Sequence, residues 1–131
     1  MPSVLIEVRK RYTADEEVAL IEAVHAALRE AFKIPASDRT LRLVAHEPHR
    51  FACPPDRARP ELSTLVTIDA FAGRSLEAKR ALYRAVVANL GRLGIPADHV
   101  TILLHEAPRE NWGIRGGQAA CDVDLGYKID V

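Results

Sequence analysis

The chain carries the stretch Ile34-Pro35-Ala36-Ser37-Asp38 and, in its second half, the close copy Ile95-Pro96-Ala97-Asp98. Each copy leads into a strand-like run that ends in the dipeptide His-Glu. A helical stretch that starts at a hydroxyl residue precedes each copy, at Thr13, 22 residues before Pro35, and at Ser75, 21 residues before Pro96. An offset of about 60 residues that is kept through helix, turn and strand indicates an internal duplication.

The first unit, residues 2–48, reads as strand, helix and strand. Residues 3–8 are rich in β-branched side chains, and residues 41–45 form the second strand-like run. Thr13 and Glu16 have the spacing of a capping box, which predicts the start of the helix. Pro35 ends the helix. The predicted apolar face of this helix consists of Val18, Ile21, Val24, Leu28 and Phe32.

The second unit, residues 63–108, repeats this order, with strands at 65–72 and 100–105 and a helix after Ser75. We therefore predict one domain, residues 1–131, of the α/β (α+β) class. Because strand–helix–strand units with parallel strands cross over right-handed, the two units can form one four-stranded sheet with both helices on one face. The apolar face of the second helix consists of Leu82, Tyr83, Val86, Val87, Leu90 and Leu93.

Two further segments complete the chain. The connection between the units, residues 48–63, contains four prolines, and connections of this length are often functional or mobile. Residues 109–131 contain a glycine-rich turn, and we expect a C-terminal hairpin or one or two short strands there, suited to reach a neighbouring subunit. The sheet face away from the helices is mixed, with Leu5 and Leu103 beside Thr67 and Asp69, which favours self-association.

Composition excludes several classes of protein. The 18 basic and 18 acidic side chains cancel, so the chain has no general field for nucleic acid or for an anionic membrane surface. No apolar run approaches the length of a membrane span, and no secretory leader is present, which predicts a cytoplasmic protein. In that compartment Cys53 and Cys121 are expected to be free thiols.

Pro2 is the first candidate catalytic residue. Removal of Met1, which methionine aminopeptidase performs before a small second residue, would leave a secondary amine at the start of a strand. Apolar burial or a nearby cation lowers the pKa of such an amine below its ordinary value of about 7.7–8.0, and it can then act as a general base. A retained Met1 would acylate the nitrogen and abolish this role. The alternative is that Met-Pro is an inert beginning.

Four features together resemble the tautomerase superfamily: Pro2, the turn Gly73-Arg74-Ser75, the segment 96–106 and the stretch Trp112-Gly113-Ile114-Arg115-Gly116-Gly117. Its short members, of the 4-oxalocrotonate tautomerase type, are single β-α-β units with an amino-terminal proline. Its long members are fused duplicates that assemble as trimers, so the resemblance implies a homotrimer of the tautomerase/macrophage migration inhibitory factor fold. Residues 35–39 and His46 look most like the malonate semialdehyde decarboxylase branch.

The resemblance also implies roles for side chains. Arg74 would bind the substrate carboxylate, since a guanidinium at a helix start can hold it with two hydrogen bonds. Asp38 matches the acid that the decarboxylase branch uses beside the proline, although Asp98 at the same place in the second unit favours a turn role instead. Trp112 matches the aromatic wall of the pocket, and could equally fill an interface.

The chain departs from the family pattern at two places. Ala72 stands where the decarboxylase branch has an arginine, and Arg115 is a candidate to replace that charge. Tyr12 stands where short tautomerases have an arginine before the first helix. The expected activity is a cofactor-free keto–enol tautomerisation of a small 2-oxo or dicarboxylate acid, with decarboxylase, dehalogenase or hydratase chemistry at a protonated Pro2 as the alternative. A non-catalytic binding or signalling trimer is the other class of function.

The remaining candidates are weaker. His46, His49 and Cys53 lie close together, and Cys121 could join them, but their spacing matches no recurrent zinc pattern, so we expect no metal and no cofactor. His25 lies on the apolar side of the first helix, where a packed core histidine is expected.

Overall fold

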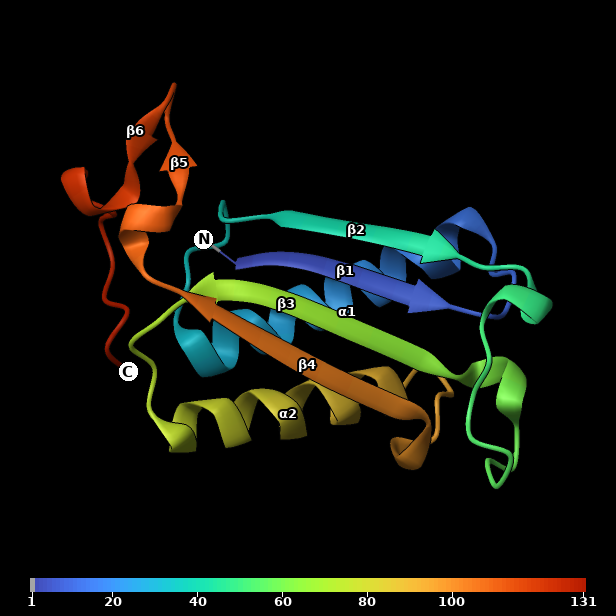
Figure 1. Cartoon of the computed structure of the whole chain (residues 1–131). Helices are drawn as coiled ribbons and strands as arrows, with labels where there is room; N and C mark the ends of the chain where they lie inside the picture. The colour runs from blue at the N-terminus through green and yellow to red at the C-terminus, as the bar shows by residue number, and fades with distance from the viewer. Residues whose placement is uncertain (1) are drawn as a thin grey trace.

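The computed structural model describes residues 2–131, and Met1 lies outside the described part. The two repeated units are visible in the order of the elements (Figure 1). The first unit consists of β1 (Pro2–Val8), α1 (Ala14–Phe32) and β2 (Thr40–Ala45). The second consists of β3 (Thr64–Phe71), α2 (Leu76–Gly91) and β4 (Val100–Ala107), followed by the short strands β5 (Gly113–Ile114) and β6 (Gln118–Ala119).

The four long strands form one sheet in the order β2-β1-β3-β4. Within each unit the strands are parallel, whereas β1 and β3, which join the units, are antiparallel. Both helices cover the same face of the sheet (Figure 1). The predicted arrangement of two β-α-β units is therefore confirmed.

The local signals explain where α1 begins and ends. The Thr13 hydroxyl accepts a hydrogen bond from the Glu16 amide at 3.2 Å, and the Glu16 carboxylate accepts one from the Thr13 amide at 2.9 Å. This reciprocal pair satisfies two amides that a helix start leaves without partners. The helix ends at Lys33, whose left-handed backbone (φ 56°) turns the chain toward Pro35.

The core lies between the sheet and the two helices. Alternate residues of β1 and β3 are buried on the helix side, as a two-residue period requires. Two residues of the predicted helix faces are corrected by the structure: Val18 is 57% exposed and Leu93 is 44% exposed. Val18 stands six residues before the buried Val24, a rotation of about 120° around a helix of 3.6 residues per turn. Leu93 lies beyond Gly91, where α2 ends.

The segment after β6 is not a strand. The hairpin of β5 and β6 agrees with the hairpin or short strands expected within residues 109–131, and residues 123–131 form no strand. Gly126 has a left-handed backbone (φ 80°), and its amide donates to Asp124 Oδ1 at 2.9 Å, so an extended conformation is interrupted. The segment instead ends beside the turn before α2, where the Ser75 amide donates to the Val131 carbonyl at 2.9 Å.

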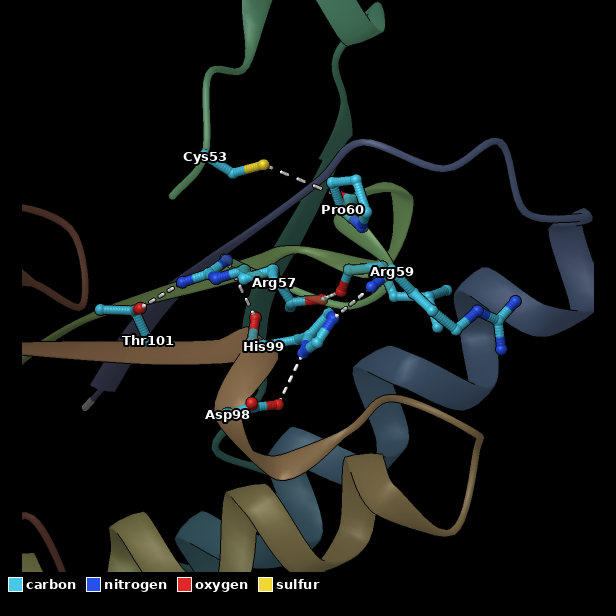
Figure 2. A network of polar contacts seen from close by, with 9 residues as sticks. Cys53, Arg57, Arg59, Pro60, Asp98, His99 and Thr101 are labelled. Carbon is cyan, nitrogen blue, oxygen red and sulfur yellow. Dashed lines mark hydrogen bonds and ion pairs between the residues drawn. The ribbon is translucent and has the colours of Figure 1, made fainter. Parts of the chain in front are cut away.

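The connection between the units is anchored to the start of β4 by His99, which is completely buried (Figure 2). Its Nε2 accepts from the Arg59 amide at 3.0 Å, so Nδ1 carries the proton and donates to Asp98 Oδ1 at 2.7 Å. Arg57 adds contacts of 3.4 Å to the His99 carbonyl and to Thr101. This anchor lies at the end of the sheet away from the amino terminus (Figure 1).

Candidate active site

The sheet register gathers the predicted site residues, with the exception of Tyr12, at one end of the molecule. Pro2 pairs with Ala70 of β3, and Ser3 pairs with Thr40, so Asp38 stands at the same end. β3 and β4 run opposite to β1, and their carboxyl ends therefore meet the amino end of β1. Arg74 and Trp112 follow those carboxyl ends, and the β5–β6 hairpin lies at the end of the sheet where β1 starts (Figure 1).

Pro2 occupies the first position of β1, between β2 and β3, and is buried. Proline is compatible with this place, because the first residue of a strand can lack a ladder donor. The state of Met1 lies outside the described residues.

Arg74 is buried, with 5% of its surface exposed, in the turn that leads to α2. Its Nη1 donates to the Phe71 carbonyl at 3.2 Å, and its guanidinium carbon lies 4.6 Å from the centre of the Phe32 ring. Burial lowers the pKa of Arg74, while nearby Tyr127 and Asp38 oppose that shift. Its Nε and Nη2 are buried, and the hydroxyl of Tyr127 is a hydrogen-bond partner of the guanidinium. A guanidinium has five N–H donors, and a carboxylate ligand can accept two of them in parallel.

The turn before α2 also depends on Gly73. Its backbone has φ 132°, which side-chain-bearing residues rarely adopt, and a Cβ there would lie 3.3 Å from Ile129 Cγ2. The glycine therefore lets the carboxyl-terminal segment pack against the turn that carries Arg74.

Asp38 meets a residue that the sequence did not suggest. Tyr127, from the carboxyl-terminal segment, donates its hydroxyl to Asp38 Oδ2 at 3.1 Å. Burial and the Asp38 carboxylate together raise the pKa of Tyr127 to about 12, against weaker opposition from Arg74. The phenol is therefore neutral at physiological pH and acts as a hydrogen-bond donor. No sequence signal marked Tyr127, since it stands 89 positions from Asp38 in a segment without periodicity.

Two cavities meet at Tyr127. The first, about 170 Å³, is lined by Asp38, Ile114, Arg115, Leu125 and Tyr127. Arg115 thus lies in the same cavity as Asp38, held by a 2.9 Å hydrogen bond from Nη1 to the Asp124 carbonyl.

The second cavity, about 430 Å³, is also lined by Tyr127 and includes Ala72, Gly73, Arg109 and Lys128. Arg109 is a further residue that the sequence did not suggest, and it brings a cation to the cavity of Ala72.

Trp112 directly precedes β5 and packs in the core at this end of the molecule. Its ring packs edge-on against Phe71, with ring centres 5.0 Å apart, in a small apolar cluster with Ala120 and Ile129. Its indole Nε1 is buried and has no hydrogen-bond partner in the described part of the chain. Trp112 lines neither of the two cavities that meet at Tyr127.

Tyr12 lies elsewhere. It follows β1 and lines a cavity of about 80 Å³ with Glu16, Ala19, Leu20 and Leu93. Because β1 runs from Pro2 to Val8, Tyr12 is at the opposite end of the sheet from Pro2 within one chain. Burial raises the pKa of Tyr12.

The weaker sequence candidates have other partners. His46 Nε2 contacts Glu7 Oε1 at 2.9 Å, and Arg9 donates to the Cys53 sulfur at 3.6 Å. Cys53 and Cys121 are both free thiols. From residue 2 to residue 131, no three His, Cys, Asp or Glu side chains form a group that could hold a metal ion. None of the helices in this range is both long and apolar enough to cross a membrane.

A duplicated β-α-β frame with a proline, a buried arginine and a carboxylate at one end is the architecture of tautomerase enzymes. Residues 38–115 match the Tautomerase_2 family, described as tautomerase enzymes. The chain belongs to this family.

Similar proteins support this assignment. The chain is 42% identical over 48 residues to a 2-hydroxymuconate tautomerase of Comamonas testosteroni, a match that spans 36% of this chain and 76% of that protein. That relative is thus about the size of one unit, as expected for an unduplicated member.

Solved structures match nearly the whole chain. A structure of FG41 malonate semialdehyde decarboxylase inhibited by 3-bromopropiolate is 29% identical, with a TM-score of 0.75, and the match covers 89% of this chain and 92% of that one. An asymmetric trimer of fused 4-OT matches with a TM-score of 0.81 and 19% identity, over 92% of this chain and 97% of that one. The second likeness concerns the fold alone.

Proposed function

We propose that this chain is a cofactor-free keto–enol tautomerase of a small 2-oxo or dicarboxylate acid, with Pro2 as the general base. The observation that carries the proposal is the buried guanidinium of Arg74, beside Tyr127 and at the end of the sheet where β1 begins. A substrate carboxylate bound by this guanidinium would bring its reacting carbon toward the proline nitrogen. Proline placement at a strand start and the family match support the same assignment.

The reaction needs only a proton transfer. The Pro2 nitrogen removes a proton from the carbon next to the substrate carbonyl. The electron pair of the broken C–H bond forms a C=C double bond, and the π pair of the carbonyl moves to its oxygen. The proton held by Pro2 is then delivered to that oxygen, or to the far carbon of a conjugated substrate, so the reaction requires no cofactor. Arg74 binds the carboxylate, and the Asp38–Tyr127 pair orients the substrate or relays the proton. Trp112 supports the apolar wall, and Arg115 offers a second cation.

The charge of the Pro2 amine decides between activities. A base must be neutral, and we expect the Arg74 cation and apolar surroundings to favour the neutral amine. Asp38 has the opposite effect. Because Tyr127 donates to the Asp38 carboxylate at 3.1 Å, part of that carboxylate's effect on the amine is offset, which favours the neutral amine and tautomerisation.

Decarboxylation of a malonate semialdehyde-like acid at a protonated Pro2 is the second candidate. The specific observation in its favour is Asp38, a carboxylate at the amino-terminal end of β1, together with the 29% identity to a malonate semialdehyde decarboxylase. This candidate is weakened because Ala72 stands where the decarboxylase branch has an arginine. Arg109, however, lines the same cavity as Ala72.

The assembly that suits this function is a homotrimer in the cytoplasm, like the fused 4-OT trimer that the fold resembles. Tyr12 could join a Pro2 site only from a neighbouring subunit, because it stands at the far end of its own sheet. A non-catalytic binding trimer remains the outcome if Pro2 is chemically inert.

The test uses Pro2→Ala and wild-type protein, each with its intact mass measured. We expect wild-type protein to lack Met1, to be labelled by 3-bromopyruvate at the amino terminus, and to tautomerise enol-phenylpyruvate or a 2-hydroxydienoate. Loss of one general base lowers the rate by about 10²–10⁴-fold, so turnover should collapse in Pro2→Ala. Retained Met1, or equal rates in the two proteins, would show that Pro2 is not the base. Consumption of malonate semialdehyde alone would favour the second candidate.

A further inference from the structure

His25 of α1 contacts the backbone of Asp38, and the contacts of the His25 ring determine which of its nitrogens carries the proton. The ring is 3% exposed. Its Nε2 stands 3.0 Å from the Asp38 backbone carbonyl, and its Nδ1 stands 3.1 Å from Arg39 Nη1. The same Arg39 nitrogen also donates to Glu22 Oε2 at 3.1 Å, so the arginine is held in place from the other side.

These contacts leave only one arrangement of protons. A guanidinium can donate hydrogen bonds but cannot accept them. Nδ1 of His25 must therefore be the acceptor toward Arg39 and carry no proton. Nε2 then carries the proton of the neutral ring and donates it to the Asp38 carbonyl. In an imidazolium, the Nδ1–H of His25 would point at the N–H of the Arg39 guanidinium, so two donors and two positive charges would oppose each other.

We propose that His25 is a positioning residue for Asp38, locked by Arg39 in the tautomer that carries its proton on Nε2. The Asp38 amide donates to the Pro35 carbonyl at 3.0 Å, so His25 completes the fixation of both backbone polar groups of Asp38. With its backbone held on two sides, Asp38 directs its carboxylate to Tyr127 and to the cavity that both residues line. The catalytic part of this inference rests on the function proposed above.

The second unit shows that the turn does not need such a histidine. Val87 stands 62 positions after His25, the same offset that separates Ser75 from Thr13, so α2 has an apolar residue at the equivalent place. Asp98, the counterpart of Asp38, uses its side chain to bind His99 instead. The histidine therefore belongs to the unit whose aspartate faces the cavity, and not to the shared turn.

The tautomer is tested on wild-type protein by ¹⁵N NMR of the histidine ring nitrogens. We expect a pyridine-type Nδ1 and a pyrrole-type Nε2 for His25 near neutral pH. The reverse pattern, or an imidazolium, would overturn the lock. Arg39→Met should release the tautomer and Arg39→Lys, which still offers a donor, should keep it. If both variants kept the wild-type pattern, Arg39 would not be the cause.

The positioning role is tested by kinetics of His25→Leu and His25→Gln, since glutamine can still donate to Asp38 and accept from Arg39. Small misplacements at an active site cost up to about 10²-fold in rate, so we expect kcat to fall by about 10- to 100-fold in His25→Leu with little change in KM. His25→Gln should recover most of kcat.

The matched control is Asn89→Leu. Asn89 donates to the Ala23 carbonyl of α1 at 3.0 Å, a bond of the same kind that lies away from the site. This control should lose stability without losing kcat. Equal kcat losses in the control and in His25→Leu would mean a purely structural role and overturn the proposal.

A wild-type protein that turns over none of the substrates would refute the proposed function but not this inference. In that case the Asp38 carboxyl ¹³C signal and its contact with Tyr127 are compared in wild type, His25→Gln and Arg39→Met. The positioning role is supported if the Asp38 carboxyl signal shifts in Arg39→Met but not in His25→Gln. It is overturned if Arg39→Met leaves the Asp38 signal and its Tyr127 contact unchanged.

Discussion

Tyr127 shows how a single side chain links the carboxyl-terminal segment to the site. Its folded pKa of about 12 lies above the value of about 10 expected in the unfolded chain. The phenol thus stabilises the fold fully below pH 10, and that contribution is lost as the pH rises through 12. We expect the stability difference between wild type and Tyr127→Phe to shrink across this interval, measured by urea unfolding. In a tyrosinate absorbance titration, Tyr127→Phe should lack the last-titrating group. A Tyr127 that ionised near pH 10 would contradict the hydrogen bond to Asp38.

Gly73 is the residue whose backbone allows the carboxyl-terminal segment to pack against the turn before α2. In Gly73→Ala, the φ of 132° is strained and the new Cβ meets Ile129 at 3.3 Å. Such strained backbone costs about 1–3 kcal/mol, so we expect a loss of that size in the free energy of unfolding. Gly113→Ala is the control, because its Cβ would meet no atom within 4 Å and its backbone is not left-handed. Equal stability of the two variants would contradict this account.

At the scale of an element, the buried His99 contributes an anchor to the connection of residues 48–63 (Figure 2). His99→Leu leaves the Arg59 amide without its acceptor and Asp98 without its donor, and lost buried hydrogen bonds cost about 1–3 kcal/mol. We expect faster proteolysis within residues 48–63, while circular dichroism of the sheet and helices is unchanged. The exposed His49→Leu in the same connection should cleave at the wild-type rate. Unaltered proteolysis of His99→Leu would mean that other contacts hold the connection.

At the scale of the whole molecule, the two faces of the sheet differ. One face is covered by α1 and α2. The other face carries Leu103, which is 48% exposed. We expect light scattering to give the mass of a trimer and Leu103→Glu to dissociate it, because a carboxylate cannot be buried without a partner at low cost. Val18→Glu places the same charge on a valine that is 57% exposed on α1, and this variant should stay trimeric. A wild-type monomer would refute the proposed assembly.

Local patterns were sufficient for the elements and for much of the site. The capping box at Thr13, the stop at Pro35 and the alternating strands depend on residues near in sequence, and the structure contains each of them. The duplication further predicted that both helices lie on one face of a four-stranded sheet. Pro2, Asp38, Arg74 and Trp112 were proposed from the sequence, and they stand at one end because of strand direction.

Tertiary structure alone decided which further side chains lie at the end of the sheet that carries the candidate site. Tyr127 and Asp38 are 89 positions apart, and Arg109 reaches the cavity of Ala72 only because β4 lies beside β3. The sequence by itself determined the repeated elements and their order, since helix caps, turns and apolar periodicity act over a few residues. Contacts of the irregular segment 123–131 follow no period, and its path depends on packing against groups that the sheet first brings together. Local sequence therefore determines the frame, and long-range packing decides which side chains share the site.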